Sequence, residues 1–343
     1  MSPPIRLSTN YWQPCPLHEP STMIDSLSQE QLNKHPAIAS LTDMVRLRYG
    51  ARELSGFPKI QARQMLAGGH KSSFRGRGMD FDQVRLYQPG DDVRSIDWRV
   101  TARTQTPHTK IFSEERERPI LVITDLRGPM FFGSQQLKSV IACEISAALA
   151  WAGLSANDRA GGVVFGQQQQ IDVKARRSHH AVLQLIHALQ EYSAKLLEPQ
   201  EDRYSLAEML EESRRFTPTG SSIFIISDFH DLNDDCEHHL FELARHGSLN
   251  LCHVYDEIEA VLPDPSLYAV SDGQQQTMLD TGNNELRQRF EKAFADRSLR
   301  LRKLSEKFAA GLLPFSTADN VMSVLGRAYG KRRSNARNSS GGQ

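Results

Sequence analysis

Between residues 119 and 255, near-continuous apolar runs alternate with segments of helical periodicity, and few folds accept that alternation. Short runs of this kind are typical of strands covered on both faces of a sheet. Because a helix separates successive strands, the strands should run parallel in right-handed βαβ units. We expect strands at 119–125, 162–165, 222–228 and 249–255, with a short one at 171–173. The sequence therefore predicts an α/β fold with a doubly wound, mainly parallel sheet.

Helical periodicity and turn residues predict the other elements of this region. Helices are expected at 137–154, 181–197, 205–216, 236–246 and 285–310. A hairpin turning at Asp272-Gly273 and an edge strand at 312–316 should follow the main sheet.

The composition changes on both sides of this region, and these changes divide the chain into four parts. Residues 1–34 are rich in Pro, Ser, Thr and Gln and predict a loose extension. Residues 35–118 combine a helical segment with a charged, β-rich module, and 119–326 form the α/β domain. Residues 327–343 end in a basic, Ser/Gly/Asn-rich tail that predicts disorder.

Composition narrows the possible functions. Lys and Arg together number 41, as do Asp and Glu, so the formal net charge is zero. This balance argues against a dedicated nucleic-acid binder, which usually carries excess basic charge. Four scattered cysteines fit a reducing compartment. With no secretory signal and no transmembrane stretch, we expect a soluble, cytoplasmic protein, and peripheral membrane association stays open.

Three predicted strands end in aspartate, at Asp125, Asp228 and Asp256. Ligands of open parallel sheets bind at the carboxyl ends of the strands, so we expect these carboxylates to face outward together and form a recognition surface. Carboxylates gathered there would suit a hard cation such as Mg²⁺, and a metal-dependent hydrolase or nuclease is one interpretation. The alternative is that each aspartate caps the turn or helix that follows it.

A run of motifs with fixed spacing precedes the first strand. It comprises SFRGRGMDF (73–81), RLYQPGDD (85–92), SIDW (95–98) and TAR (101–103). This run closely resembles the bacterial family catalogued as domain of unknown function 58, and the likeness covers about residues 35–260. The resemblance implies a von Willebrand factor A-like domain of Rossmann type with an N-terminal extension. It also implies work beside a MoxR-type AAA+ ATPase.

Domains similar to von Willebrand factor A bind a divalent ion at a metal-ion-dependent adhesion site. The resemblance places Asp125 and Asp228 at its two aspartate positions and Ser205 at its threonine position. Arg127 and Pro129 stand where the pattern has two serines. We therefore expect a degenerate, metal-free site in which the Arg127 guanidinium bridges Asp125 and Asp228. No cofactor is expected, and Mg²⁺ is the ion that an intact site would hold.

Residues that could contact a partner lie near the strand ends and in the charged module. Residues 75–118 hold nine Lys or Arg and eight Asp or Glu, a mixture that suggests internal ion pairs or a docking surface. Trp98 is a candidate interface anchor, although we expect it in a core. The candidate partner-binding residues are Arg127, His230, Asp231, Arg75, Arg77 and Arg103.

No G-x-S-x-G, P-loop or H-E-x-x-H motif occurs, so the common hydrolase and NTPase chemistries lack their parts. We expect a non-enzymatic protein-interaction adaptor that works with a MoxR-type ATPase on a client protein, without nucleic acid. The work would be assembly, maturation or chaperone-like. Two alternatives remain: a metal-dependent hydrolase or nuclease using the strand-end aspartates, and an envelope-associated scaffold whose basic tail touches anionic lipid.

Overall fold

A computed structural model of the chain describes residues 28–54, 79–89, 91, 93–114, 118–198, 200–271 and 276–330. The described residues form two compact units. The larger unit contains those before residue 61 and from 118 onward, and the smaller unit contains those between 61 and 117. The helices that we grouped with the charged module therefore belong to the larger unit.

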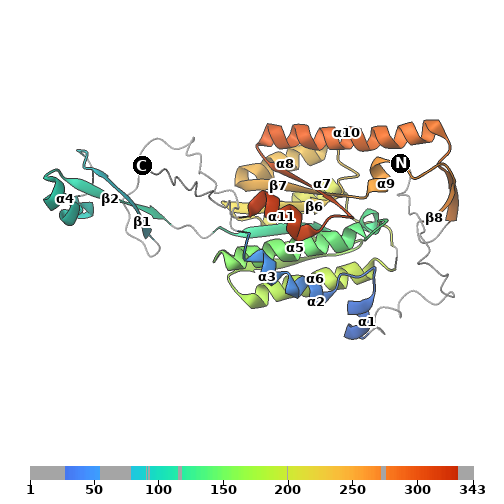
Figure 1. Cartoon of the computed structure of the whole chain (residues 1–343), viewed down its shortest axis with the longest axis horizontal. Helices are drawn as coiled ribbons and strands as arrows, with labels where there is room; N and C mark the ends of the chain where they lie inside the picture. Colours follow the sequence, from blue (N-terminus) through green and yellow to red (C-terminus); the bar gives the residue numbers. More distant parts are fainter. Residues whose placement is uncertain are drawn as a thin grey trace, which may run out of the picture. The chain divides into compact units, whose positions relative to one another are not determined.

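In the described part of the chain, the larger unit has one six-stranded sheet ordered β10-β7-β6-β3-β4-β5 (Figure 1). Neighbouring strands run parallel except for β5, which pairs with β4 antiparallel at one edge. The predicted mainly parallel α/β sheet is confirmed. Its strands are β3 (Ile120–Asp125), β4 (Ala160–Phe165), β5 (Gln170–Arg176), β6 (Ser221–Ser227), β7 (Gly247–Tyr255) and β10 (Gly311–Ser316).

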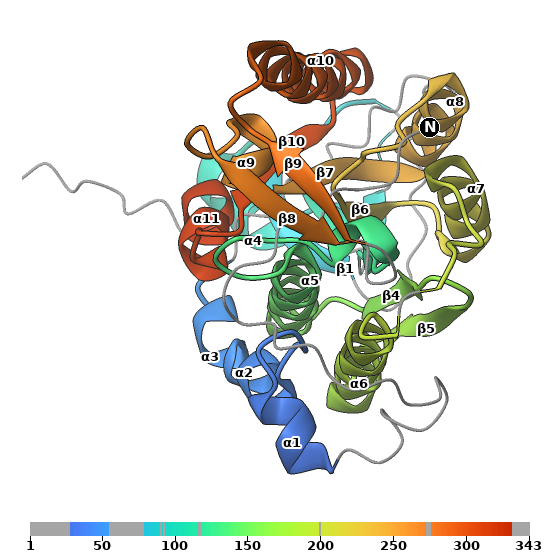
Figure 2. The ribbon, with the colours of Figure 1, turned by 90° about the vertical axis from the view of Figure 1, so that its right-hand side faces the viewer.

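Alternate side chains of the central strands pack into two cores, one on each face of the sheet. In β3, Ile120 and Val122 belong to one core, and Leu121 and Ile123 belong to the other. Both faces of the strand are apolar because helices cover both, as Figure 2 shows. One core is covered by α5 (Lys138–Ser155), α6 (His179–Lys195) and α11 (Val321–Tyr329), and the other by α7 (Leu206–Phe216), α8 (Asp234–His246) and α10 (Asn284–Phe308).

The helix starts are set mostly by side-chain caps. Ser178, Ser205 and Asn233 each accept a backbone N–H of the helix that follows, at α6, α7 and α8. Helix α5 differs, because its N-cap Leu137 makes no side-chain bond and its first residue is Lys138. Among the described helices, none combines the length and the apolar character needed to cross a bilayer.

Shorter elements complete the larger unit. The last residues of the predicted N-terminal extension form α1 (Gln29–Lys34), which has a capping box. The predicted hairpin is present as β8 and β9, although its turn lies outside the described residues. Helix α11 reaches into the predicted tail, whose residues 331–343 also lie outside them. The remaining elements are α2 (Leu41–Arg46), α3 (Arg48–Ala51), η2 (Gly128–Met130), α9 (Glu257–Ala260), β8 (Leu267–Ser271) and β9 (Gln276–Asp280).

The smaller unit is an antiparallel hairpin with one short helix. Strand β1 (Met79–Leu86) pairs with β2 (His108–Glu114), and between them lie η1 (Val93–Ser95) and α4 (Trp98–Thr104). The indole of Trp98 is 67% exposed, so its expected core position is wrong.

Candidate functional site

Three buried aspartates lie where the parallel strands end. Asp125 is the last residue of β3, and Asp228 and Asp256 directly follow β6 and β7. Their relative exposures are 1%, 1% and 0%. We expected these carboxylates to face outward together as a recognition surface. That expectation is wrong for the carboxylates themselves, and each must be neutralised or fully hydrogen-bonded inside the protein.

Each aspartate first fixes its own loop. The side chain of each accepts the backbone N–H two residues later, at 3.1 Å for Asp125, 3.2 Å for Asp228 and 2.9 Å for Asp256. Asp forms such turns readily. The capping alternative is therefore confirmed for all three positions, and the charges need separate partners.

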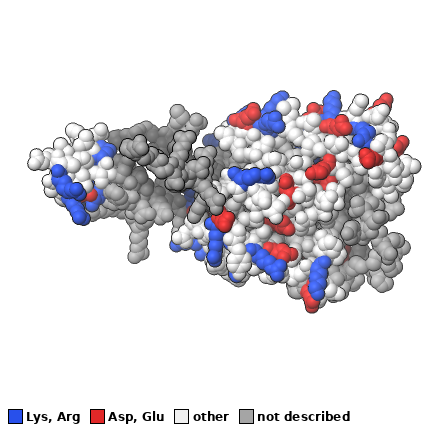
Figure 3. All heavy atoms as spheres, in the orientation of Figure 1, with Lys and Arg blue, Asp and Glu red and all other residues white. Residues whose placement is uncertain are grey.

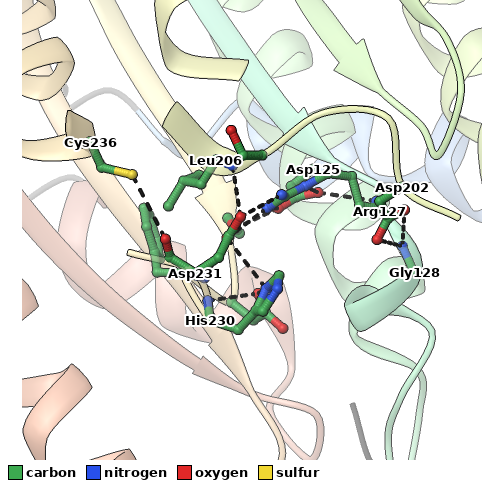
Figure 4. A network of polar contacts seen from close by, with 12 residues as sticks. Asp125, Arg127, Gly128, Asp202, Leu206, His230, Asp231 and Cys236 are labelled. Atoms are coloured by element: carbon green, nitrogen blue, oxygen red, sulfur yellow. Dashed lines mark hydrogen bonds and ion pairs between the residues drawn. The ribbon is translucent and has the colours of Figure 1, made fainter. Parts of the chain in front are cut away.

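Arg127 neutralises Asp125 (Figure 4). Its Nε and Nη2 donate to the two oxygens of Asp125 at 2.9 and 2.8 Å. Its Nη1 and Nη2 donate to the two oxygens of Asp231 at 2.9 and 3.1 Å, and Nη1 also donates to the Tyr204 carbonyl at 3.1 Å. A guanidinium has five N–H donors, and here every one has an acceptor. Paired bonds of this kind are the strongest that arginine makes with carboxylates.

The remaining lone pairs of Asp125 are also used. Its Oδ2 accepts the hydroxyl of Ser227 at 2.7 Å, and that hydroxyl accepts the backbone N–H of Phe229 at 3.0 Å. With the backbone and side-chain bonds from Arg127, four donors reach this carboxylate. Asp125 is therefore saturated by groups of the protein.

Asp228 has a different cation. The ammonium of Lys138 donates to Asp228 at 2.7 Å and to Glu259 at 2.7 Å, and its side chain is 1% exposed. His230 links the two parts of the network, because its Nδ1 lies 3.2 Å from Asp228 and 3.5 Å from Asp231. The predicted Arg127 bridge between Asp125 and Asp228 is thus wrong. The guanidinium joins Asp125 to Asp231 instead.

The charges of the network support one another. Burial by itself would raise the pKa of Asp228, but Lys138 and His230 outweigh it and hold that pKa well below its ordinary value. Burial would lower the pKa of Lys138, but Asp228 and Glu259 raise it. Burial would likewise lower the pKa of His230, and Asp228 with Asp231 raises it above 6.5. In each of these three groups the shift in pKa favours the charged form.

Sequence reasoning missed Lys138, which lies inside the predicted helix 137–154 and was given no role there. Its place at the first position of α5 was the available signal. A cation there interacts unfavourably with the helix dipole, and nearby carboxylates offset that interaction. Which carboxylates supply that charge depends on tertiary structure, since Asp228 and Glu259 lie 90 and 121 residues further along the chain.

Asp256 is held by neutral donors. Its Oδ2 accepts the backbone N–H and the hydroxyl of Ser134 at 2.6 and 2.9 Å, and the hydroxyl of Thr317 at 2.5 Å. Its Oδ1 accepts from Ile258 at the start of α9. Asp256 thus joins three separate segments and has a structural role.

Ser205 does not join the network through its side chain. It is the exposed N-cap of α7, and its hydroxyl forms a capping box with Glu208. The next residue contributes instead, because the backbone N–H of Leu206 donates to Asp231 at 2.8 Å. The structure therefore brings Asp125 and Asp228 to one edge of the sheet but leaves Ser205 engaged elsewhere.

A divalent cation does not fit these residues. Arg127 and Lys138 already place positive charges within 3 Å of Asp125 and Asp228, and a metal ion would be repelled by both. Among the described residues, no group of three or more His, Cys, Asp or Glu side chains is arranged to hold a metal ion. These side chains form an internal ion-pair network instead.

The predicted partner-binding residues separate into three groups. Arg127 is 2% exposed, so its guanidinium cannot reach a partner, and that prediction is wrong. The side chain of His230 is 35% exposed and that of Asp231 is 16% exposed, which leaves both at the surface of the network. Arg103 is exposed in the smaller unit, and Arg75 and Arg77 lie outside the described residues.

Comparison with known proteins gives one family and several relatives. The family described as "Protein of unknown function DUF58" matches residues 83–300. An uncharacterized protein of Mycobacterium bovis is 27% identical over 316 residues, which is 89% of this chain and 98% of that protein. Uncharacterized proteins from two strains of Mycobacterium tuberculosis match to the same extent.

A solved structure gives a weaker likeness. The crystal structure of an aerotolerance-related membrane protein from Bacteroides fragilis matches with a TM-score of 0.37 and 15% identity. The match covers 62% of this chain and 96% of the other.

Proposed function

The chain belongs to the DUF58 family, and from that premise we propose that it is a non-enzymatic adaptor that docks a partner protein at the carboxyl ends of its sheet. The docking domain is von Willebrand factor A-like, and the partner is a MoxR-type AAA+ ATPase. Together, the adaptor and the ATPase act on a client protein in assembly, in maturation or in a chaperone-like role. The observation that carries this proposal is the buried network in which Arg127 and Lys138 neutralise Asp125 and Asp228.

The order of the acidic residues supports a von Willebrand factor A-like origin. Asp125 ends β3 and Asp228 follows the neighbouring strand β6, so the two carboxylates meet at one edge. These are the places where an adhesion site has its first and last aspartates. In this chain the protein's own cations take the place of the ion, and the surface above them is preorganised without a metal.

A binding role also fits the state of the carboxylates better than catalysis does. A general base needs a free lone pair within reach of a substrate proton. Asp125 and Asp228 are buried, and Asp125 already accepts four hydrogen bonds. His230, whose side chain is 35% exposed, is the residue of the network that is left for recognition.

Capture of the ATPase tests the docking site. The full-length chain is immobilised, and the MoxR-type ATPase of the same organism is passed over it with a non-hydrolysable ATP analogue. We expect His230→Ala to weaken binding about tenfold, the loss typical of a contributing interface residue. His187→Ala is the matched control, because His187 is exposed in the middle of α6. Failure of the unmodified chain to bind, or equal loss in both variants, would overturn the proposed docking site.

Calorimetry separates the adaptor from the metal-dependent hydrolase or nuclease. Titration of the purified chain with millimolar Mg²⁺ or Mn²⁺ should give no binding heat, because Arg127 and Lys138 already neutralise the carboxylates of Asp125 and Asp228. The same titration of Arg127→Ala reports whether removal of one cation opens the site. Stoichiometric binding by the unmodified protein would favour the enzyme.

A further inference from the structure

The helix of the smaller unit has one face that is exposed along its whole length. At 100° per residue, Trp98, Ala102, Arg99 and Arg103 fall on one side of α4, within an arc of about 140°. All four are exposed. Arg99 and Arg103 are four positions apart and therefore adjacent on the helix surface. This outer face of α4 presents an indole, a methyl group and two guanidinium groups.

The opposite side of α4 is fixed to the hairpin. The backbone N–H of His108 donates to the hydroxyl of Thr101 at 3.0 Å, and its carbonyl accepts from Asp97 at 2.8 Å. Asp97 also caps the helix by accepting the backbone N–H groups of Arg99 and Val100. The outer face is therefore held in place before any partner arrives, which lowers the entropy cost of binding.

The arginines of the outer face lack an acidic neighbour among the described residues. The carboxylate of Asp97 caps the helix and pairs with Lys110 at 3.5 Å, and that of Asp91 pairs with Arg85 at 2.6 Å. In Figure 3, Lys and Arg side chains gather over α4. Two like charges at this spacing repel each other, and a carboxylate placed between them would relieve that repulsion.

The smaller unit also exposes large apolar side chains. Trp98, Leu86 and Val93 are 67%, 59% and 58% exposed. Leu86 pairs with His108 across the hairpin, and the residue before Trp98 is bonded to the other side of His108. With strands about 4.8 Å apart, Leu86 lies within about 10 Å of the start of α4. The outer face of α4 itself presents Trp and Arg, two residue types that are enriched at the energetic centres of protein interfaces.

We propose that the outer face of α4 docks an acidic segment of a partner protein. Trp98 is its apolar anchor, and Arg99 and Arg103 donate to carboxylates of the partner. A protein is favoured over nucleic acid because two arginines neutralise too few phosphates, and residues 75–118 are nearly balanced in charge. This proposal rests on residues of the smaller unit alone, and it and the docking site proposed at the strand ends can each fail without the other.

Site-specific crosslinking tests the proposal. Ala102 lies between Trp98 and the arginines on the outer face, and it is replaced by benzoylphenylalanine in the full chain, expressed in its native cell. After irradiation, we expect a crosslink to a protein segment rich in Asp and Glu, mapped by mass spectrometry. The same probe at Lys292 on the exposed side of α10 is the control.

Charge reversal completes the test. Arg99→Glu with Arg103→Glu should reduce the Ala102 crosslink at least tenfold, and Arg289→Glu with Lys292→Glu, which changes the net charge equally, should leave it intact. A synthetic peptide of the crosslinked segment should bind the unmodified chain and lose about 20-fold in affinity to Trp98→Ala. Crosslinks to nucleic acid, to a second copy of this chain or to a segment without acidic excess would overturn the proposal. So would a yield no higher than at Lys292.

Discussion

Arg127→Met is expected to lower the free energy of unfolding by about 3–5 kcal/mol, the range found when one partner of a buried ion pair is removed. Methionine fills much of the volume but removes four of the hydrogen bonds that the Asp125 and Asp231 carboxylates accept. Urea denaturation at neutral pH measures the loss. A change below about 1 kcal/mol would mean that the guanidinium does not neutralise these carboxylates.

Two further variants separate charge from packing. Arg245→Met removes an arginine that is 65% exposed and paired with Glu242, so it should cost less than about 1 kcal/mol. The triple variant Asp125→Asn, Arg127→Met, Asp231→Asn removes all three charges. It should be more stable than Arg127→Met alone, because no uncompensated charge stays buried. If the triple variant is the less stable, lost packing is the cause and the charge argument fails.

Lys138→Met has the second-largest expected effect, also about 3–5 kcal/mol at neutral pH. It leaves Asp228 buried beside Glu259 with no ammonium between them. Lys195→Met is the matched control, since that side chain is 46% exposed and pairs with Glu191 on the surface. Its loss should be below about 1 kcal/mol.

The effect of Lys138→Met should depend on pH in a defined direction. In the unmodified protein the pKa of Asp228 is held below its unfolded value, so its contribution is present at neutral pH and is lost as pH falls through the folded pKa. Without Lys138, burial raises the pKa of Asp228, and protonation relieves the variant as the solution is acidified. The stability gap between the two proteins should therefore narrow between about pH 7.5 and about pH 5. A gap that is constant or widens would show that Lys138 does not act through Asp228.

The α/β fold could be predicted because its determinants are local. When helices cover both faces of a sheet, a central strand such as β3 must be apolar on both sides. Such a strand is visible in the sequence as a continuous run of apolar residues. The direction of an edge strand and the unit to which a short helix belongs were harder to predict from the sequence. The antiparallel direction of β5 and the membership of α2 and α3 in the larger unit depend on contacts distant in sequence.

The candidate site could be predicted only in part, for the same reason. The location of Asp125 and Asp228 follows from strand ends, and Arg127 is two residues from Asp125, so a local ion pair was within reach. The second carboxylate bound by Arg127 is 104 residues away at Asp231, and nothing local distinguishes it from Asp228. Trp98 shows the opposite error, because a large apolar residue was expected in a core and lies on an exposed helix face.

The complete use of the Arg127 donors has an evolutionary consequence. A lineage that replaced Arg127 with a small polar residue would leave Asp125 and Asp231 without a cation in the interior, while Lys138 still paired with Asp228. Each single substitution of a charged residue in the network passes through a less stable protein, and only several coordinated substitutions avoid that intermediate. The network therefore acts as an evolutionary constraint, because its charged residues keep the protein stable only when they change together.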